Sequence, residues 1–211
     1  MKRLLIIGGV VLLLGGLGIL ILNDEELTII EVGKNNEEIL SIKSDDWIKG
    51  NEAGKLTLVE YSDFECPACG AYYPIVKTIG EEFKEDLRII YRHYPLPQHT
   101  RAKEAAYAAE AVGKQGKFWE MHDLLFLNQN SWNVLNEPMN EFSKYAGQLG
   151  LNTEQFLIDA NDVKSKNRIL HDLKEGGVLK LFSTPTFYLN GKIIENPTTI
   201  EHISNLMKDF D

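Results

Sequence analysis

The feature that most constrains the fold is a Cys-Pro-Ala-Cys sequence that joins a strand-like segment to a helix-like one. Both cysteines of the 211-residue chain, Cys66 and Cys69, lie in it. The preceding residues, 55–61, are apolar and β-branched and predict a buried strand. Pro67 suits the first turn of a helix, because the N–H group that proline lacks has no partner there. We therefore expect Cys66 at the N-terminus of a helix that extends to about Lys84.

Two cysteines at this spacing can hold half of a zinc site, form a structural disulfide or act as a redox pair. A structural zinc site usually needs a second Cys or His pair at similar spacing. No two of the five histidines are three to five residues apart, so a zinc site that borrows two of them is the minor alternative. A disulfide across so short a loop removes little entropy from the unfolded chain. The spacing therefore favours a redox pair.

The position of the pair at a helix start assigns different roles to its two sulfurs. Unpaired N–H groups and the helix dipole favour a thiolate there, and the thiolate is the nucleophile in disulfide exchange. We expect Cys66 to be the exposed, attacking sulfur. Cys69, one turn further, would be shielded and would resolve a mixed disulfide by attacking Cys66. Asp63 and Glu65 oppose a neighbouring thiolate, so the direction of the net pKa shift stays open.

Two further positions are candidates for the same site. Glu60 lies near the end of the first strand, where a carboxylate is costly unless it is paired. It is interpreted as a proton acceptor for Cys69, directly or through water, and an acid paired with a lysine at the sheet edge is the alternative. Pro185 begins a later strand, where proline normally costs a ladder hydrogen bond. We expect a cis peptide at Thr184–Pro185 that places this strand beside the cysteines, with a trans proline as the alternative.

The remaining patterns give the order of elements. Residues 87–93 predict a second strand, and strand, helix and strand form a parallel crossover unit. Residues 100–181 show helical periodicity and almost no strand signal. Residues 186–194 predict a hairpin around Asn190-Gly191, and a capping box at Thr198 starts a last helix. The predicted order is β-α-β, a helical insert, a β-hairpin and a helix.

Helical spacing also places apolar residues on common faces of the expected helices. One such set is Phe142, Tyr145, Ala146 and Leu149, and another is Val163, Leu170, Leu173, Gly177 and Leu181. The last helix is expected to bury Ile200, Ile203, Met207 and Phe210.

The N-terminal residues predict a membrane anchor. Lys2 and Arg3 precede an uncharged apolar run from Leu4 to Leu22. As a helix this run reaches about 28 Å, close to the hydrocarbon thickness of a bilayer. Positive residues before it and acidic residues after it place the rest of the chain outside the cytoplasm, in the periplasm or at the cell surface. A cleaved secretory signal is the alternative, and it leads to the same compartment.

These patterns divide the chain into three parts. Residues 1–22 are the anchor or uncleaved signal, residues 23–54 are a connector, and residues 55–211 are a folded domain with its helical insert at about 98–182. The connector is expected to contain a short strand at 27–32 and a helical turn near 45–49. The net charge of −9 argues against nucleic acid as a partner, because binding it needs a clustered positive face.

Three separated motifs together resemble the DsbA family of thioredoxin-fold disulfide oxidoreductases. They are Glu60, the motif Cys66-Pro67-Ala68-Cys69 and the run Thr184-Pro185-Thr186-Phe187. The resemblance covers residues of about 45–211, and residues 91–99 are also similar. It implies an α/β thioredoxin-like fold whose helical insertion lies between the second core strand and the hairpin. It also implies that the loop with Thr184 and a cis Pro185 faces the cysteines and holds extended peptide substrates by backbone pairing. Pro67 and Ala68 are the other expected substrate-binding residues.

The resemblance leaves the direction of exchange open. Pro-Ala replaces the Pro-His of strongly oxidising members, and Thr184 is similar to isomerase and reductase relatives as much as to oxidases. The predicted function is a membrane-anchored enzyme that introduces disulfides into exported proteins through Cys66 and Cys69. A separate membrane protein would re-oxidise it, and no cofactor is expected. A reductase or isomerase, and a peptide-binding module with an inert disulfide, are the alternatives.

Overall fold

The computed structural model describes residues 11–13, 19–23, 26–30, 36–196, 199, 201, 202, 204 and 205. The chain divides into two compact units, residues 1–41 and residues 42–211. In the first unit, β1 (Val11–Leu13), β2 (Ile19–Asn23) and β3 (Glu26–Ile30) form an antiparallel sheet. The short helix α1 (Asn36–Leu40) follows it. The strand expected at 27–32 is therefore confirmed for residues 27–30 and begins one residue earlier, whereas residues 31 and 32 lie outside the described residues.

The predicted membrane helix falls in this first unit. Much of residues 4–22 lies outside the described residues, and the parts that are described, in β1 and β2, are strands. Among the described residues, no helix is long and apolar enough to cross a membrane.

The second unit is built on a five-stranded sheet with the order β4-β6-β5-β7-β8. Its strands are β4 (Trp47–Gly50), β5 (Leu56–Ser62), β6 (Leu87–His93), β7 (Thr186–Leu189) and β8 (Lys192–Ile194). The central strand β5 pairs in parallel with β6 and antiparallel with β7. This register places Glu60 opposite Tyr91 on one side and opposite Phe187 on the other.

The helical turn expected near residues 45–49 is wrong, because Trp47–Gly50 is the edge strand β4. It pairs antiparallel with β6, opposite Arg88 to Tyr91. Trp47 also stacks on Phe118, with ring centroids 4.4 Å apart. These partners lie far along the chain, so strand pairing and packing override the local helical tendency.

Helix α2 (Pro67–Glu82) connects the parallel strands β5 and β6. It buries Cys69, Tyr73, Val76 and Ile79, which follow one another at the spacing of a single helix face. This face packs on the sheet, where Val76 and Ile79 join a core cluster with Leu58 and Ile89. The helix that carries the cysteines is thus fixed to the central strands by a conventional apolar face.

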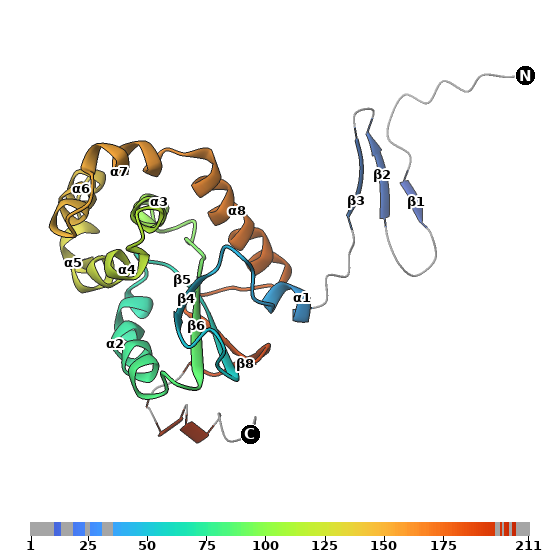
Figure 1. The fold of residues 1–211 in the computed structure, drawn as a ribbon. Helices are drawn as coiled ribbons and strands as arrows, with labels where there is room; N and C mark the ends of the chain where they lie inside the picture. Colours follow the sequence, from blue (N-terminus) through green and yellow to red (C-terminus); the bar gives the residue numbers. More distant parts are fainter. Residues whose placement is uncertain are drawn as a thin grey trace, which may run out of the picture. The chain divides into compact units, whose positions relative to one another are not determined.

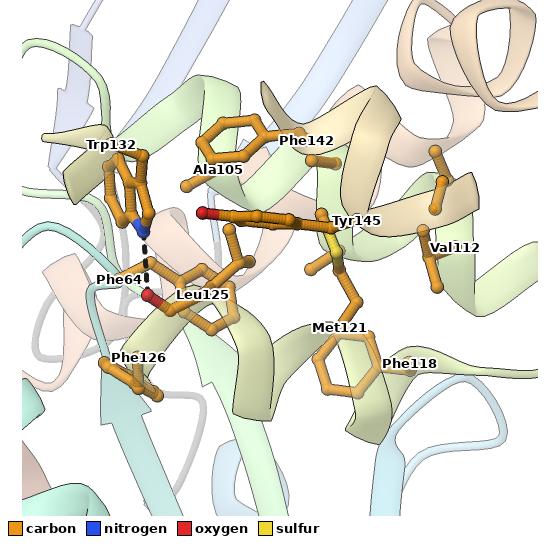
Figure 2. Close-up of a cluster of buried hydrophobic side chains, with 14 of the residues drawn as sticks. Phe64, Ala105, Val112, Phe118, Met121, Leu125, Phe126, Trp132, Phe142 and Tyr145 are labelled. Atoms are coloured by element: carbon orange, nitrogen blue, oxygen red, sulfur yellow. Dashed lines mark hydrogen bonds between the residues drawn. The ribbon is translucent and has the colours of Figure 1, made fainter. Parts of the chain in front are cut away.

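The expected helical insertion between the second core strand and the hairpin is confirmed. It consists of α3 (Ala102–Lys114), α4 (Phe118–Leu127), α5 (Gln129–Trp132), α6 (Met139–Gln148), α7 (Thr153–Ala160) and α8 (Val163–Val178). Small alanines of α3 let neighbouring helices approach closely around a second core. Figure 2 shows this core, in which the indole N–H of Trp132 donates to the carbonyl of Leu125 at 2.7 Å.

The apolar residues expected on one face of α8 do not form its buried face. Val163 is 67% exposed and Leu170 is 48% exposed. The buried residues of α8 are instead Ser165, Ile169, Asp172, Glu175 and Gly176.

The reason lies on β6, which carries the fully buried Arg92 and the buried His93. Asp172 accepts from the His93 backbone N–H at 2.9 Å, and Glu175 lies 3.6 Å from the Arg92 guanidinium. A helix that covers a buried guanidinium and a buried backbone N–H group must turn carboxylates inward. Figure 1 shows α8 and α2 on opposite sides of the sheet.

The hairpin expected at residues 186–194 is confirmed as β7 and β8. Asn190 and Gly191 have positive φ angles of 46° and 78°, the left-handed conformation that this tight turn requires. The residues predicted as the buried face of the last helix, Ile200, Ile203, Met207 and Phe210, lie outside the described residues, as does Thr198. The Thr199 hydroxyl accepts from the His202 backbone N–H at 3.1 Å, as a helix cap does.

Candidate active site

Cys66 occupies the N-cap of α2, between the end of β5 and Pro67 at the first helical position. Its own carbonyl accepts from the Gly70 N–H at 3.1 Å. The side-chain amide of Gln129 donates to the carbonyls of Phe64 and Cys66, at 2.7 and 2.9 Å. This buried glutamine, from the helical insert, fixes the loop that carries the attacking sulfur. Nothing in its local sequence indicates the role.

The two thiols lie against different partners. The Cys66 thiol donates to the Thr184 carbonyl at 3.4 Å, and the Asp63 backbone N–H donates to the Cys69 sulfur at 3.5 Å. The peptide bond between Thr184 and Pro185 is cis, as expected. The structure therefore brings together segments separated by more than a hundred residues.

Cys69 is fully buried, which confirms that it is shielded. Cys66 was expected to be exposed, and this expectation is wrong, because only 6% of its surface is accessible. The Thr184 carbonyl lies against its sulfur and covers it. A substrate must therefore approach where the Thr184–Pro185 segment meets the start of α2.

The structure determines the direction in which the pKa of Cys66 is shifted. The pKa of Cys66 is lowered from 9.0 to about 5, chiefly by a hydrogen bond from the Cys69 thiol. Burial opposes this shift, while the Thr184 side chain and the backbone N–H groups of Ala68 and Cys69 add to it. The pKa of Cys69 is raised well above its usual value, first by burial and then by the same hydrogen bond.

The two acidic residues beside the motif are engaged elsewhere. Asp63 accepts from the backbone N–H of Leu96 at 2.8 Å and lies 2.7 Å from the His99 ring. Glu65 accepts from the backbone N–H of Arg101 at 2.5 Å. Their charge is thus compensated by the loops around them. This explains why they do not prevent a low pKa at Cys66.

Glu60 is buried in β5, with 3% of its surface accessible. Burial raises the pKa of its carboxyl to about 7, and the Ser62 hydroxyl opposes this shift. Its charge in turn raises the pKa of Cys69, so the carboxyl and the thiol interact. Among the described residues Glu60 forms no ion pair, so the alternative of an acid neutralised by a lysine is not favoured. A carboxyl that titrates near neutral pH is suited to proton transfer.

In the described part of the chain, neither cysteine belongs to a group of three or more side chains with the spacing of metal ligands. There, one group of side chains has the spacing of metal ligands, and it is His171, Asp172 and Glu175 on α8. Two of these carboxylates already contact His93 and Lys43. The zinc alternative is therefore not supported.

A family model for thioredoxin matches residues 43–209. The chain belongs to the thioredoxin family. Among solved structures, it is similar to alpha-DsbA1 of Wolbachia pipientis, with a TM-score of 0.72 and 21% identity, covering 83% of this chain and 96% of that one. It is also similar to oxidised BdbD of Bacillus subtilis, with a TM-score of 0.69 and 22% identity, covering 77% of this chain and 91% of that one. These matches confirm the predicted resemblance to the DsbA family at the level of the fold.

Among curated proteins, the chain is similar to Na(+)/H(+) antiporter NhaA 3 of Salinispora tropica. It is 36% identical over 160 residues, which are 75% of this chain and 24% of that protein. The chain thus spans about a quarter of the length of the curated relatives that it matches.

Proposed function

We propose that residues 42–211 form a protein thiol–disulfide oxidoreductase that gives its Cys66–Cys69 disulfide to protein thiols. The observation that carries this proposal is the unequal pair of sulfurs. Cys66 has a pKa of about 5, whereas Cys69 is fully buried and its pKa is raised. At neutral pH one sulfur is therefore a ready nucleophile and leaving group, and the other stays protonated until the exchange needs it.

The exchange takes two steps. A substrate thiolate attacks the Cys66 sulfur of the disulfide, the S–S bond breaks, and Cys69 leaves as a thiolate that takes up a proton. A second substrate thiolate then attacks the substrate sulfur of the mixed disulfide. A substrate disulfide forms, and Cys66 leaves as a thiolate. Two substrate thiols are oxidised and one disulfide of this protein is reduced.

The low pKa of Cys66 supports the donor direction. A stabilised thiolate stabilises the reduced pair, so the oxidised pair is easily reduced and acts as an oxidant. The Pro-Ala dipeptide provides no histidine for this purpose. The Cys69 thiol, Thr184 and backbone N–H groups supply the stabilisation instead. A reductase or isomerase is the alternative direction.

For substrate binding, Thr184 and Pro185 are proposed to pair with an extended peptide whose reactive cysteine meets Cys66. The contact between the Cys66 sulfur and the Thr184 carbonyl supports this position. Pro67 and Ala68 at the start of α2 would form the facing wall. Pro185 is the residue proposed to orient the peptide at the reacting sulfur.

The location and partners of the enzyme are proposed from its sequence. The apolar run at residues 4–22 supports an anchored domain outside the cytoplasm, where disulfides persist. Its substrates would be exported proteins with free thiols, and a membrane protein would re-oxidise it.

A redox titration tests the direction. The full chain in detergent micelles is equilibrated with a series of glutathione ratios, and the fraction of reduced protein is measured. A potential well above about −270 mV, the value of thioredoxin, supports a disulfide donor. A potential near or below that value would overturn the donor direction.

Alkylation of the reduced protein tests the activity itself. Rapid modification of Cys66, with Cys69 unmodified, is expected for an exchange enzyme. Two unreactive cysteines would instead favour a peptide-binding module with an inert pair.

A further inference from the structure

Helix α8 turns carboxylates inward and apolar side chains outward. Its buried side includes Asp172 and Glu175, which are 3% and 5% exposed and lie against the His93 backbone and the Arg92 guanidinium. An ordinary surface helix buries its apolar side and leaves its charges in water. In α8 the polar groups buried on β6 reverse this arrangement, so apolar residues are left facing solvent.

The exposed apolar residues of α8 form a stripe. Val163, Leu170 and Val178 are 67%, 48% and 56% exposed. They are seven and eight residues apart, about two helical turns, and therefore follow one side of the helix. Single exposed apolar residues are common, whereas a contiguous apolar stripe marks an interaction surface.

The stripe leads to the proposed reaction site through Phe182, which is 92% exposed. Phe182 lies in a segment that is held on both sides. The Leu181 carbonyl accepts from the Tyr94 hydroxyl at 3.1 Å, and the Thr184 carbonyl contacts the Cys66 thiol at 3.4 Å. The backbone therefore holds Phe182 next to the segment that is proposed to pair with the substrate.

The exposed charges of α8 are positive. Lys164 and Lys174 are exposed, whereas the two carboxylates of the helix, Asp172 and Glu175, are buried. Lys180, just after the helix, is also exposed. The whole chain has a net charge of −9, so this positive surface is a local exception. Charge complementarity favours a partner with acidic side chains.

We propose that the outward face of α8 holds a segment of the protein substrate that is rich in apolar and acidic residues. The inference rests on the proposed function, because the segment belongs to the substrate whose cysteine meets Cys66. The surface continues into the Thr184–Pro185 segment, so one polypeptide can occupy both. The residues that define this α8 face are Val163, Lys164, Leu170, Lys174, Val178 and Phe182.

The geometry of the α8 face sets the length of the segment. From Val163 to Val178 the helix rises by about 22 Å. An extended polypeptide covers about 3.3 Å per residue, so about seven substrate residues reach along the helix. Because α8 leaves the reaction site in one direction, the segment must lie on one side of the reactive cysteine.

Peptide thiols with a single cysteine test this substrate preference. One has a segment of about seven leucine and glutamate residues before the cysteine, the second has it after the cysteine, and the third has serine and glycine instead. The oxidised full chain, in detergent micelles, is mixed with each peptide. Mass spectrometry after acid quenching gives the second-order rate constant for loss of the Cys66–Cys69 disulfide. One of the two leucine–glutamate peptides should react at least about tenfold faster than the other two peptides.

Substitutions on the α8 face should remove this preference. Leu170→Ser should slow the favoured peptide about fivefold, the effect of exposing half of a leucine side chain. Lys174→Glu should slow it about threefold at low salt and less at high salt, because salt screens exposed charges. Ile158→Ser is the matched control, since Ile158 is 64% exposed and lies on α7.

Reduced glutathione provides the measure of the reaction site itself. It has no segment to reach the α8 face and should react at the same rate with the wild type, Leu170→Ser, Lys174→Glu and Ile158→Ser. Equal rates also show that the variants are folded. Equal rates with all three peptides, or the same loss in Ile158→Ser, would overturn the docking surface.

A lysine footprint distinguishes the substrate from other occupants of the α8 face. Acetylation of Lys164 and Lys174 should decrease when the favoured peptide is added. If it decreases without peptide, in vesicles of phosphatidylglycerol compared with phosphatidylcholine, a lipid surface is the occupant. If it decreases with protein concentration alone, a second copy of the chain is the occupant. Either result would overturn the proposal.

The two proposals fail in different ways. If neither glutathione nor any peptide reduces the Cys66–Cys69 disulfide, the proposed function fails. If glutathione reduces it and the variants match the wild type with every peptide, only the docking surface is wrong.

Discussion

The low pKa of Cys66 can be tested by measuring how the rate of alkylation changes with pH. With a pKa of about 5, Cys66 is half ionised near pH 5. At pH 6 it is about 90% ionised, compared with about 0.1% for a thiol whose pKa is 9. The stabilised thiolate is also a weaker nucleophile, by roughly 40- to 100-fold for a shift of four units.

The larger ionised fraction of Cys66 and the weaker nucleophilicity of its thiolate have opposite effects on the rate of alkylation. At pH 7 they nearly cancel, so Cys66 would react only about 1–3 times faster than an ordinary thiol. At pH 6 ionisation prevails, and Cys66 would react roughly 10–20 times faster. The shape of the profile is therefore decisive: the rate for Cys66 should level off above about pH 6, whereas the rate for an ordinary thiol rises to about pH 9.

Removing the neighbouring thiol tests the cause. Cys69→Ala takes away the hydrogen bond that lowers the pKa of Cys66 most. Hydrogen bonds to charged groups contribute about 1.5–3 kcal/mol, which corresponds to about 1–2 pKa units. The midpoint of the alkylation profile should therefore move upward by that amount.

Cys69→Ser is the matched control, because its hydroxyl keeps a donor near the Cys66 sulfur and should restore part of the shift. Iodoacetamide and mass spectrometry of the modified peptide suffice for all three proteins. A wild-type midpoint near pH 9 would refute the lowered pKa. A midpoint near 5 in Cys69→Ala would refute the assignment of its cause.

Three further predictions concern stability and are checked by urea unfolding of the reduced protein. The pKa of Glu60 rises on folding from 4.5 to about 7. Its contribution to the free energy of unfolding is therefore fully present below pH 4.5 and is lost as pH rises through 7. Glu60→Gln should therefore stabilise the protein by about 3 kcal/mol at pH 8 and by little at pH 4; an equal effect at both would contradict this. Gln129→Ala leaves the Phe64 and Cys66 carbonyls without their donor and should cost about 1–3 kcal/mol. Arg92→Met leaves a buried Asp46 carboxylate uncompensated and should cost about 3–5 kcal/mol, and a cost below about 1 kcal/mol would show that the pair is solvated.

Local chemistry explains which elements were predictable. The hairpin was located correctly because Asn190 and Gly191 adopt the left-handed conformation that a two-residue turn requires. Helix α4 lies inside the segment 100–181 that was predicted to be helical, because its apolar residues repeat at helical spacing. The Cys66 N-cap followed from Pro67, which suits the first position of a helix. In each case a few neighbouring residues determine the conformation.

The errors share a different origin, since each depends on a partner far along the chain. Trp47–Gly50 is a strand because β6 offers it an edge. The carboxylates of α8 face inward because Arg92 and His93 lie beneath them. The burial of Cys66 depends on the Thr184 carbonyl, and the loop that carries it depends on Gln129. No local pattern contains this information.

The pKa values of Glu60 and Cys66 concern two different properties of the exchange reaction, its rate and its preferred direction. Glu60, with a pKa of about 7, has comparable amounts of both protonation states at neutral pH. In its predicted role as proton acceptor for Cys69, it would protonate that sulfur as it leaves and deprotonate it as it attacks, with little preference for either. A proton carrier of this kind changes the rate of both directions together. The preferred direction must then come from Cys66, whose stabilised thiolate exists in the reduced pair and not in the disulfide.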